Sequence, residues 1–306
     1  MDFAIALPLF ALGLAFGSFL NVCIYRLPKG SSIVHPSSAC PRCEQPIAFY
    51  DNVPILSWLI LRGRCRHCRA PISPRYLIVE LLTAALFLAC YAHFGLTLAM
   101  LKYCLFGFLL LGLMFTDAET QLLPDKMTLP GLVAGLLFSL VIPVNDLVSE
   151  ILPGLVRLPA SGMAWRWLSL LDAVSGAAVG ASFLYGAGAI YLRARGHEGM
   201  GFGDVKLMAM VGAFLGIRLT IFTIFAASIA GSLFGLWTLC AVWIKRTRRR
   251  MLRLHETAPQ ARRRAWGSAT VALQRFPVPF GVFLTGMAMV ALFFGNHLLG
   301  WYWRWF

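Results

Sequence analysis

Long apolar stretches recur along this 306-residue chain, and most approach the length at which a helix crosses a bilayer. Hydrophobic residues make up 59% of the chain and charged residues only 13%, whereas soluble domains hold about 25% charged residues. The pattern predicts an all-α polytopic membrane protein with about eight transmembrane helices, at 3–25, 76–94, 97–116, 127–142, 170–192, 205–217, 219–244 and 277–299.

The first apolar stretch is typical of a membrane anchor rather than of a cleaved signal peptide. It is preceded by Asp2 and by no lysine or arginine, and the first basic residues, Arg26 and Lys29, come only after it. Basic residues stay on the cytoplasmic side because they resist translocation. We therefore expect the N-terminus to be periplasmic.

Lysine and arginine residues are unevenly distributed between the two ends of the predicted helices. With the N-terminus outside, the cytoplasmic segments are 26–75, 117–126, 193–206 and 245–275, and they hold 22 of the 27 basic residues. This asymmetry predicts a multi-pass membrane protein with that orientation. The net charge of +14 then has a topological cause, so we expect membrane lipid and no nucleic acid as a partner.

The same segments divide the chain into three parts. The first transmembrane helix occupies 1–25, a cytoplasmic loop occupies 26–75, and a transmembrane domain occupies 76–306. That domain contains a basic cytoplasmic loop at 245–275, whose arginine clusters satisfy the positive-inside rule and could also hold anionic lipid.

Four of the eight cysteines share the loop 26–75, in two CxxC pairs separated by 21 residues: Cys40 with Cys43, and Cys65 with Cys68. Two such pairs can close tetrahedrally on one zinc ion. Disulfides would not persist in the cytoplasm, so the spacing favours a metal site. Four thiolate ligands leave no open coordination position, which predicts one structural zinc per chain rather than a catalytic metal.

Two aspartates stand where charge is costly, at the cytoplasmic ends of predicted spans. Asp117 follows an apolar run, and Asp204 precedes the span that begins at 205. Two carboxylates brought together in a low-dielectric site do not both ionise easily, so one can hold a proton while the other deprotonates water. The alternative is that both merely end or cap helices. Asp125 competes with Asp117 as the partner of Asp204, but it immediately precedes the fourth predicted span and is better explained as an N-cap.

Several further motifs, taken in order with these residues, resemble the bacterial type IV prepilin peptidases, which also process the pseudopilins of type II secretion. The resemblance runs from about residue 10 to 216. Besides both CxxC pairs and Asp117, it rests on Gly17-Ser18-Phe19-Leu20-Asn21-Val22, Tyr25-Arg26-Leu27-Pro28, Tyr50-Asp51-Asn52-Val53-Pro54, Arg62-Gly63-Arg64-Cys65, Val79-Glu80-Leu81-Leu82-Thr83, Leu123-Pro124-Asp125 and Gly201-Phe202-Gly203-Asp204-Val205-Lys206.

This resemblance implies an intramembrane aspartic endopeptidase of the bacterial inner membrane whose catalytic pair is Asp117 and Asp204, which favours Asp117 over Asp125. It implies prepilin or pseudopilin substrates, each with a short basic leader ahead of a hydrophobic helix. It also implies methylation of the new N-terminal residue with S-adenosylmethionine as methyl donor, in members that keep the full N-terminal loop. No motif in the sequence assigns residues to that methyl donor.

Two other classes of protein are compatible with part of the pattern. A transporter would use buried acids and glycine-broken helices in an ion pathway, which accounts for the aspartates but not for the CxxC pairs. A non-catalytic assembly subunit of a pilus or secretion machine would use the two loops as docking surfaces, which leaves both aspartates without a role.

Overall fold

The computed structural model describes residues 2–144, 146–156, 164–196, 201–254, 257–275 and 279–303. These residues form a helical protein, and no strand lies among them. The helices that build the bundle are α1 (Phe3–Arg26), α3 (Arg75–Phe94), α4 (Leu98–Thr120), α5 (Asp125–Ser139), α7 (Ala164–Arg195), α8 (Phe202–Leu254) and α10 (Phe280–Trp303). Shorter elements are η1 (Leu27–Lys29), η2 (Phe49–Asn52), α2 (Leu56–Ile60), α6 (Leu147–Val156) and α9 (Ala258–Arg275).

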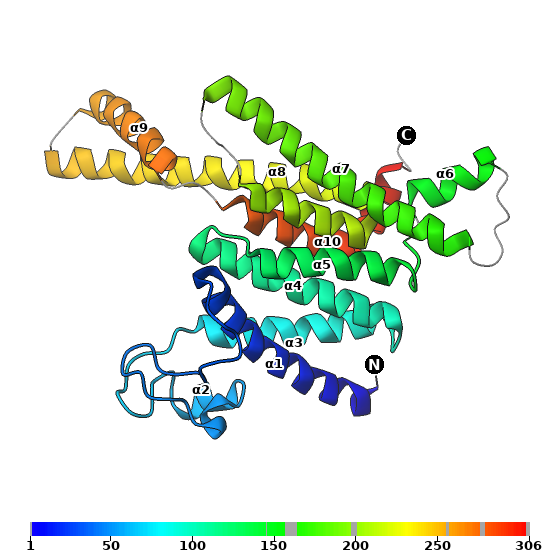
Figure 1. The fold of residues 1–306 in the computed structure, drawn as a ribbon. Helices are drawn as coiled ribbons and strands as arrows, with labels where there is room; N and C mark the ends of the chain where they lie inside the picture. The colour runs from blue at the N-terminus through cyan, green and yellow to red at the C-terminus, as the bar shows by residue number, and fades with distance from the viewer. Residues whose placement is uncertain are drawn as a thin grey trace.

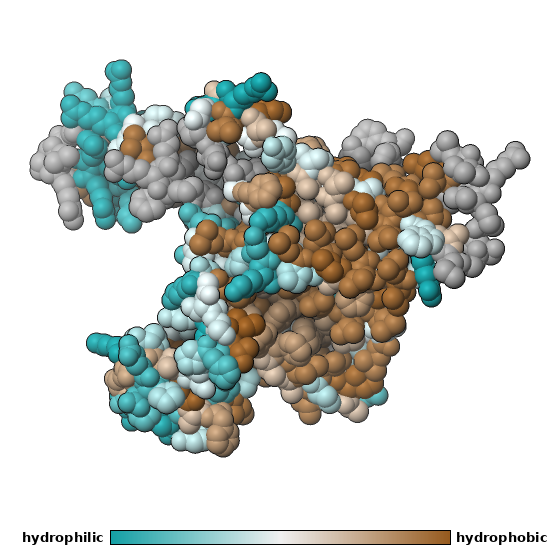
Figure 2. Space-filling view, viewed as in Figure 1, coloured by the Kyte–Doolittle hydropathy of each residue, from teal (hydrophilic) through white to brown (hydrophobic). Residues whose placement is uncertain are grey.

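The main helices run roughly side by side, in an order that departs from the order of the sequence (Figure 1). Helix α1 packs on α3, α3 on α4, and α10 on both α4 and α8, while α7 lies along α8. On the face shown in Figure 2, apolar residues cover the middle of this bundle, and hydrophilic residues gather at one end of it. That end carries the connection between α1 and α3, residues 27–74, which we call the cysteine loop. We call this end of the bundle the loop end and the opposite one the far end.

Six helices within the described residues are long and apolar enough to cross a membrane, which confirms the polytopic all-α class. The number eight is not confirmed. The predicted span 127–142 is the 15-residue helix α5, which is short for a crossing. The predicted spans 205–217 and 219–244 both lie in α8, which consists of two helices that meet at a kink at Gly216, where the backbone has φ 79° and ψ −176°.

Glycines account for the closest contacts between helices. A Cβ atom at Gly13 or Gly17 of α1 would lie 2.6 Å from the Cα atom of Ala84 or Glu80, so these two helices pack backbone against backbone. Glycines of α7 and α8 do the same, since a side chain at Gly212 would overlap the backbone of α7. Glycines spaced four residues apart therefore predict close helix contacts correctly at these positions. Gly235, by contrast, faces open space.

The predicted basic loop 245–275 is largely helical. Helix α8 continues to Leu254, and α9 packs against this extension, leaving 255 and 256 outside the described residues. The indole of Trp243 donates to the carbonyl of Arg262 (3.1 Å) and meets the ring of Trp266 edge to face. The two helices form a hydrophilic projection at the loop end of the bundle (Figures 1 and 2).

Candidate active site and metal centre

The two CxxC pairs of the cysteine loop form a pair of matching turns. In the first, the amide of Glu44 donates to the carbonyl of Cys40 (2.9 Å), and in the second the amide of Arg69 donates to the carbonyl of Cys65 (3.1 Å). Glu44 and Arg69 both have a φ of 58°, in the left-handed region. The same local fold thus occurs twice, 25 residues apart in sequence, and presents two thiols each time.

These turns bring the four thiols together. The Sγ atoms are 3.8 Å apart for Cys40 and Cys68, 4.0 Å apart for Cys43 and Cys65, and all four lie within 4.8 Å of one another. A tetrahedral zinc with Zn–S bonds of about 2.3 Å requires sulfur atoms about 3.8 Å apart. The four residues fit that requirement, so the cluster could hold a zinc ion as predicted. Its ligand set would be closed and therefore structural.

Backbone groups and one ion pair prepare the loop for this role. Hydrogen bonds to the backbone of Arg42 and Cys43 lower the pKa of the Cys40 thiol to about 6, which favours the metal-binding thiolate. Arg66, next to a cysteine of the second turn, donates from Nε to the carboxylate of Asp51 (2.7 Å). This hydrogen bond lowers the pKa of Asp51 and joins the middle of the loop to its second turn.

The cysteine loop is attached to the bundle through a buried glutamate. The backbone amide of Ile55 donates to Oε2 of Glu80 in α3 over 2.8 Å. Ile55 has a φ of 61°, so the chain bends sharply where it meets the carboxylate. Glu80, an unusual acid inside a predicted span, therefore orders the loop against α3.

Asp117 lies buried in the last turns of α4, at the loop end. Its Oδ2 atom accepts a hydrogen bond from the backbone amide of Val282 at the start of α10 (3.0 Å). The neighbouring residue must be small, because a Cβ atom at Gly281 would lie 2.8 Å from the same oxygen. The first turn of α10 therefore orients this carboxylate.

Asp204 is buried in the first turn of α8, also at the loop end. Its carboxylate lies close enough to that of Asp117 for the two charges to repel each other. The preceding residue brings the segments together, because a Cβ atom at Gly203 would approach the Cβ of Leu123 to 3.0 Å. The structure thus brings the two predicted residues into one site, shared by α4, α8 and α10.

Asp125 has a different position from the one predicted. It is the first residue of α5, whose N-cap is Pro124, so it is not a cap. Both of its carboxylate oxygens lie 2.7 Å from Nζ of Lys206, two residues after Asp204. Asp125 therefore forms an ion pair with Lys206, and this pair joins the start of α5 to the start of α8.

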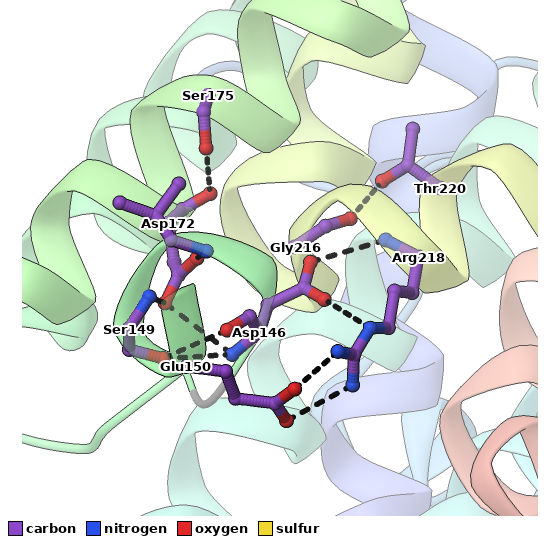
Figure 3. A network of polar contacts seen from close by, with 9 residues as sticks. Asp146, Ser149, Glu150, Asp172, Ser175, Gly216, Arg218 and Thr220 are labelled. Atoms are coloured by element: carbon purple, nitrogen blue, oxygen red, sulfur yellow. Dashed lines mark hydrogen bonds and ion pairs between the residues drawn. The ribbon is translucent and has the colours of Figure 1, made fainter. Parts of the chain in front are cut away.

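A second group of buried acids lies at the far end and was given no role in the sequence analysis (Figure 3). Asp172 of α7 accepts hydrogen bonds from the amides of Val148 (2.8 Å) and Ser149 (3.1 Å), and so caps the first turn of α6. Asp146 accepts from the amide of Arg218 (3.0 Å), just beyond the break in α8 at Gly216. These acids hold helix ends.

Sequence could have signalled some of the residues that it missed. Asp172 lies inside a predicted span, where any acid is a candidate for a specific role. Lys102, one of the five basic residues outside the predicted cytoplasmic segments, is fully buried in α4 with its Nζ 5.2 Å from the ring centre of Tyr103. The hydrogen bond from Val282 to Asp117 could not be predicted from the sequence, because it is made by a backbone amide and not by a side chain.

Comparison with protein families gives two matches along the chain. Residues 11–94 match the family described as the Bacterial Peptidase A24 N-terminal domain, and residues 103–236 match the Type IV leader peptidase family. The first range holds the cysteine loop, and the second holds both Asp117 and Asp204. Helix α10 lies beyond both ranges.

Known proteins show the same similarity. Proteins named prepilin leader peptidase/N-methyltransferase include one from Aeromonas hydrophila, 34% identical over 96% of this chain and 92% of its own length. The protein of that name from Klebsiella pneumoniae is 41% identical over 68% of this chain and 84% of its own length. That from Myxococcus xanthus is 41% identical over 76% of this chain, and the alignment spans 63% of the relative. No solved structure matches this chain.

Proposed function

Because this chain belongs to the type IV leader peptidase family, we propose that it removes the basic leader from type IV prepilins or type II secretion pseudopilins and methylates the new N-terminus. The relatives' names support both activities. The observation that carries the peptidase is the pair of buried, mutually repelling carboxylates, Asp117 and Asp204, at one end of the bundle.

In the proposed reaction, one carboxylate of the pair takes a proton from the attacking water. The other, protonated, donates a hydrogen bond to the scissile carbonyl oxygen, and the proton taken from the water passes to the leaving amine as the C–N bond breaks, which returns the pair to its starting state. Their repulsion favours this division, because two neighbouring carboxylates share one proton more readily than both ionise. The amide of Val282 orients Asp117, so less ordering is needed when substrate binds.

We assign the loop end to the cytoplasm. The bias of basic residues supports this orientation, since 22 of 27 lie in the segments at that end. A substrate with a basic leader and a following apolar helix would keep its leader in the cytoplasm and its helix in lipid. Its cleavage site would then lie at the level of Asp117 and Asp204.

The methyl transfer is proposed on the family relationship. S-adenosylmethionine would supply an electrophilic methyl group, and the new N-terminal amine would be the nucleophile. The cysteine loop lies at the same end of the bundle as the two aspartates, within the range that matches the N-terminal domain model. Cleavage and methylation could therefore act on one bound substrate without moving it across the membrane.

The peptidase assignment is tested with purified protein in detergent and a prepilin substrate. We expect Asp117→Ala and Asp204→Ala to abolish cleavage, while Asp125→Asn, which changes a cation-paired acid beside the site, retains it. Either alanine variant cleaving at the wild-type rate would show that the assigned pair is wrong. A transporter or an assembly subunit would show no cleavage with any variant.

The metal assignment has a separate test. Elemental analysis should find about one zinc per chain, as a closed four-thiolate site requires. Replacing Cys40 and Cys65 by serine removes one ligand from each turn and should remove the metal. The matched control is Cys240→Ser, an exposed cysteine of α8 outside the loop. Unchanged zinc in the double variant would contradict the site.

Mass spectrometry of the mature substrate tests the methylation. With S-adenosylmethionine present, the cleaved product should gain one methyl group. Cleavage without that mass change would limit the protein to peptidase activity.

A further inference from the structure

Helix α2 of the cysteine loop exposes an apolar face. Leu56, Leu59 and Ile60 are 58%, 55% and 74% exposed, and their spacing places them on one side of the helix. The other side faces the loop, where buried Ser57 donates to the carbonyl of Tyr50 (3.0 Å). Apolar side chains gathered on one face of a short helix mark a surface that contacts something else.

The attachment of the loop fixes the height of α2 along the bundle. Ile55, the residue before α2, donates its amide to Glu80, which is the sixth residue of α3. Five residues of helix rise about 7.5 Å, so α2 starts beside the first turns of a membrane helix and not beyond its end. This height corresponds to the boundary between lipid headgroups and acyl chains.

Helix α3 also carries exposed apolar residues at this height. Ile78, Leu81 and Leu82, in the turns of α3 around Glu80, are exposed apolar residues of a membrane helix. In the space-filling view, apolar residues over α2 lie near the apolar surface of the bundle (Figure 2). Both α2 and the start of α3 therefore expose apolar side chains at the same height along the bundle.

We infer that α2 lies in the interface of the bilayer and anchors the cysteine loop to the lipid surface through Leu56, Leu59 and Ile60. Exposed Arg62 and Arg64 follow the helix directly, where guanidinium groups can meet lipid phosphates. The partner is the lipid leaflet on the loop side. A substrate helix or a second copy of the chain on this face would be a different outcome.

Depth-dependent quenching tests the inference in the full-length protein. An environment-sensitive fluorescent amino acid replaces Ile60, and in a matched control it replaces Arg42, an exposed residue of the first cysteine turn. The proteins are placed in vesicles of phosphatidylethanolamine and phosphatidylglycerol that contain spin-labelled lipids. We expect the probe at 60 to be quenched at least about threefold more than the probe at 42, most strongly by labels near the headgroup.

Two results would overturn the inference. Equal quenching at 60 and 42, with zinc content at the wild-type level to show that the loop is folded, would overturn the inference. If the substitution at 60 lowers the zinc content, the same comparison is made with the probe at Leu59. A photo-crosslinking amino acid at Leu59 should give lipid adducts, and adducts with protein alone would contradict a lipid partner. None of these measurements depends on cleavage, so the inference and the proposed function fail separately.

Discussion

Two groups of buried acids lie at opposite ends of this bundle, and they differ in what surrounds their oxygens. At the far end, Asp172 and Asp146 accept hydrogen bonds from backbone amides at helix starts, and Arg218 lies beside Asp146. At the loop end, Asp117 also accepts a backbone hydrogen bond, from Val282, but no cation pairs with it or with Asp204 among the described residues, and the two carboxylates repel each other. Buried acids that hold helix ends stabilise a fold. Two buried carboxylates that repel each other are instead held in an unfavourable arrangement, which acid–base catalysis uses.

The largest expected effect comes from neutralising one member of the opposed pair. Asp204→Asn should lower the cleavage rate at least about 1,000-fold, because proton transfer by the pair is lost. The same change should leave the melting temperature in detergent unchanged or raise it, because it removes repulsion. A large loss of thermal stability in this variant would place Asp204 with the structural acids and remove the contrast.

A substitution in the far-end group should have the opposite effect, lowering stability while leaving the cleavage rate unchanged. Asp172→Asn keeps the shape but weakens the cap of α6, which should lower the free energy of unfolding by about 1–3 kcal/mol. Cleavage per folded molecule should stay near the wild-type value. Thermal unfolding and a rate normalised to folded protein measure the two effects, and a selective loss of rate would mean that Asp172 serves the reaction.

A substitution at the break in α8 should have a somewhat smaller effect on the free energy of unfolding. Gly216→Ala places a side chain at a φ of 79° and against the carboxylate of Asp146, so we expect a destabilisation of about 1–2 kcal/mol. Gly235→Ala, in the same helix with open space around it, is the matched control and should be neutral or stabilising. Equal melting temperatures for the two variants would show that the break bears no strain.

The smallest effect is expected at the exposed edge of the far-end group. Glu150 pairs with Arg218, but both side chains are about half exposed. Glu150→Gln should therefore change stability by at most about 1 kcal/mol. A loss as large as that of Asp172→Asn would show that the whole far-end network acts as one unit.

The cysteine site could be predicted from the sequence because its geometry is local. Each CxxC pair sets its own turn, so spacing alone implies four converging thiols. The glycine contacts of α1 with α3 were predictable for a similar reason, since spacing along one helix defines one face. The family resemblance then supplied the pairing of Asp117 with Asp204, which spacing could not.

The remaining features depend on contacts between distant segments. The role of Asp125 was predicted incorrectly because Lys206, its partner, comes 81 residues later. The number of eight spans is not confirmed, because the predicted span 127–142 forms only the 15-residue helix α5, whereas the predicted boundary between 217 and 219 lies next to the kink at Gly216. The helical form of 245–275 was missed because its buried face consists of alanines, Ala261, Ala265 and Ala269, which carry little hydrophobic signal.

The contact between α10 and Asp117 has a consequence for recombining proteins of this kind. The matched peptidase range ends at residue 236, yet the amide that orients Asp117 belongs to Val282. A chimaera joined at the end of that range would keep both aspartates but take the support of one of them from the other parent. Junctions placed after Trp303 would transfer the site together with the helix that orients it.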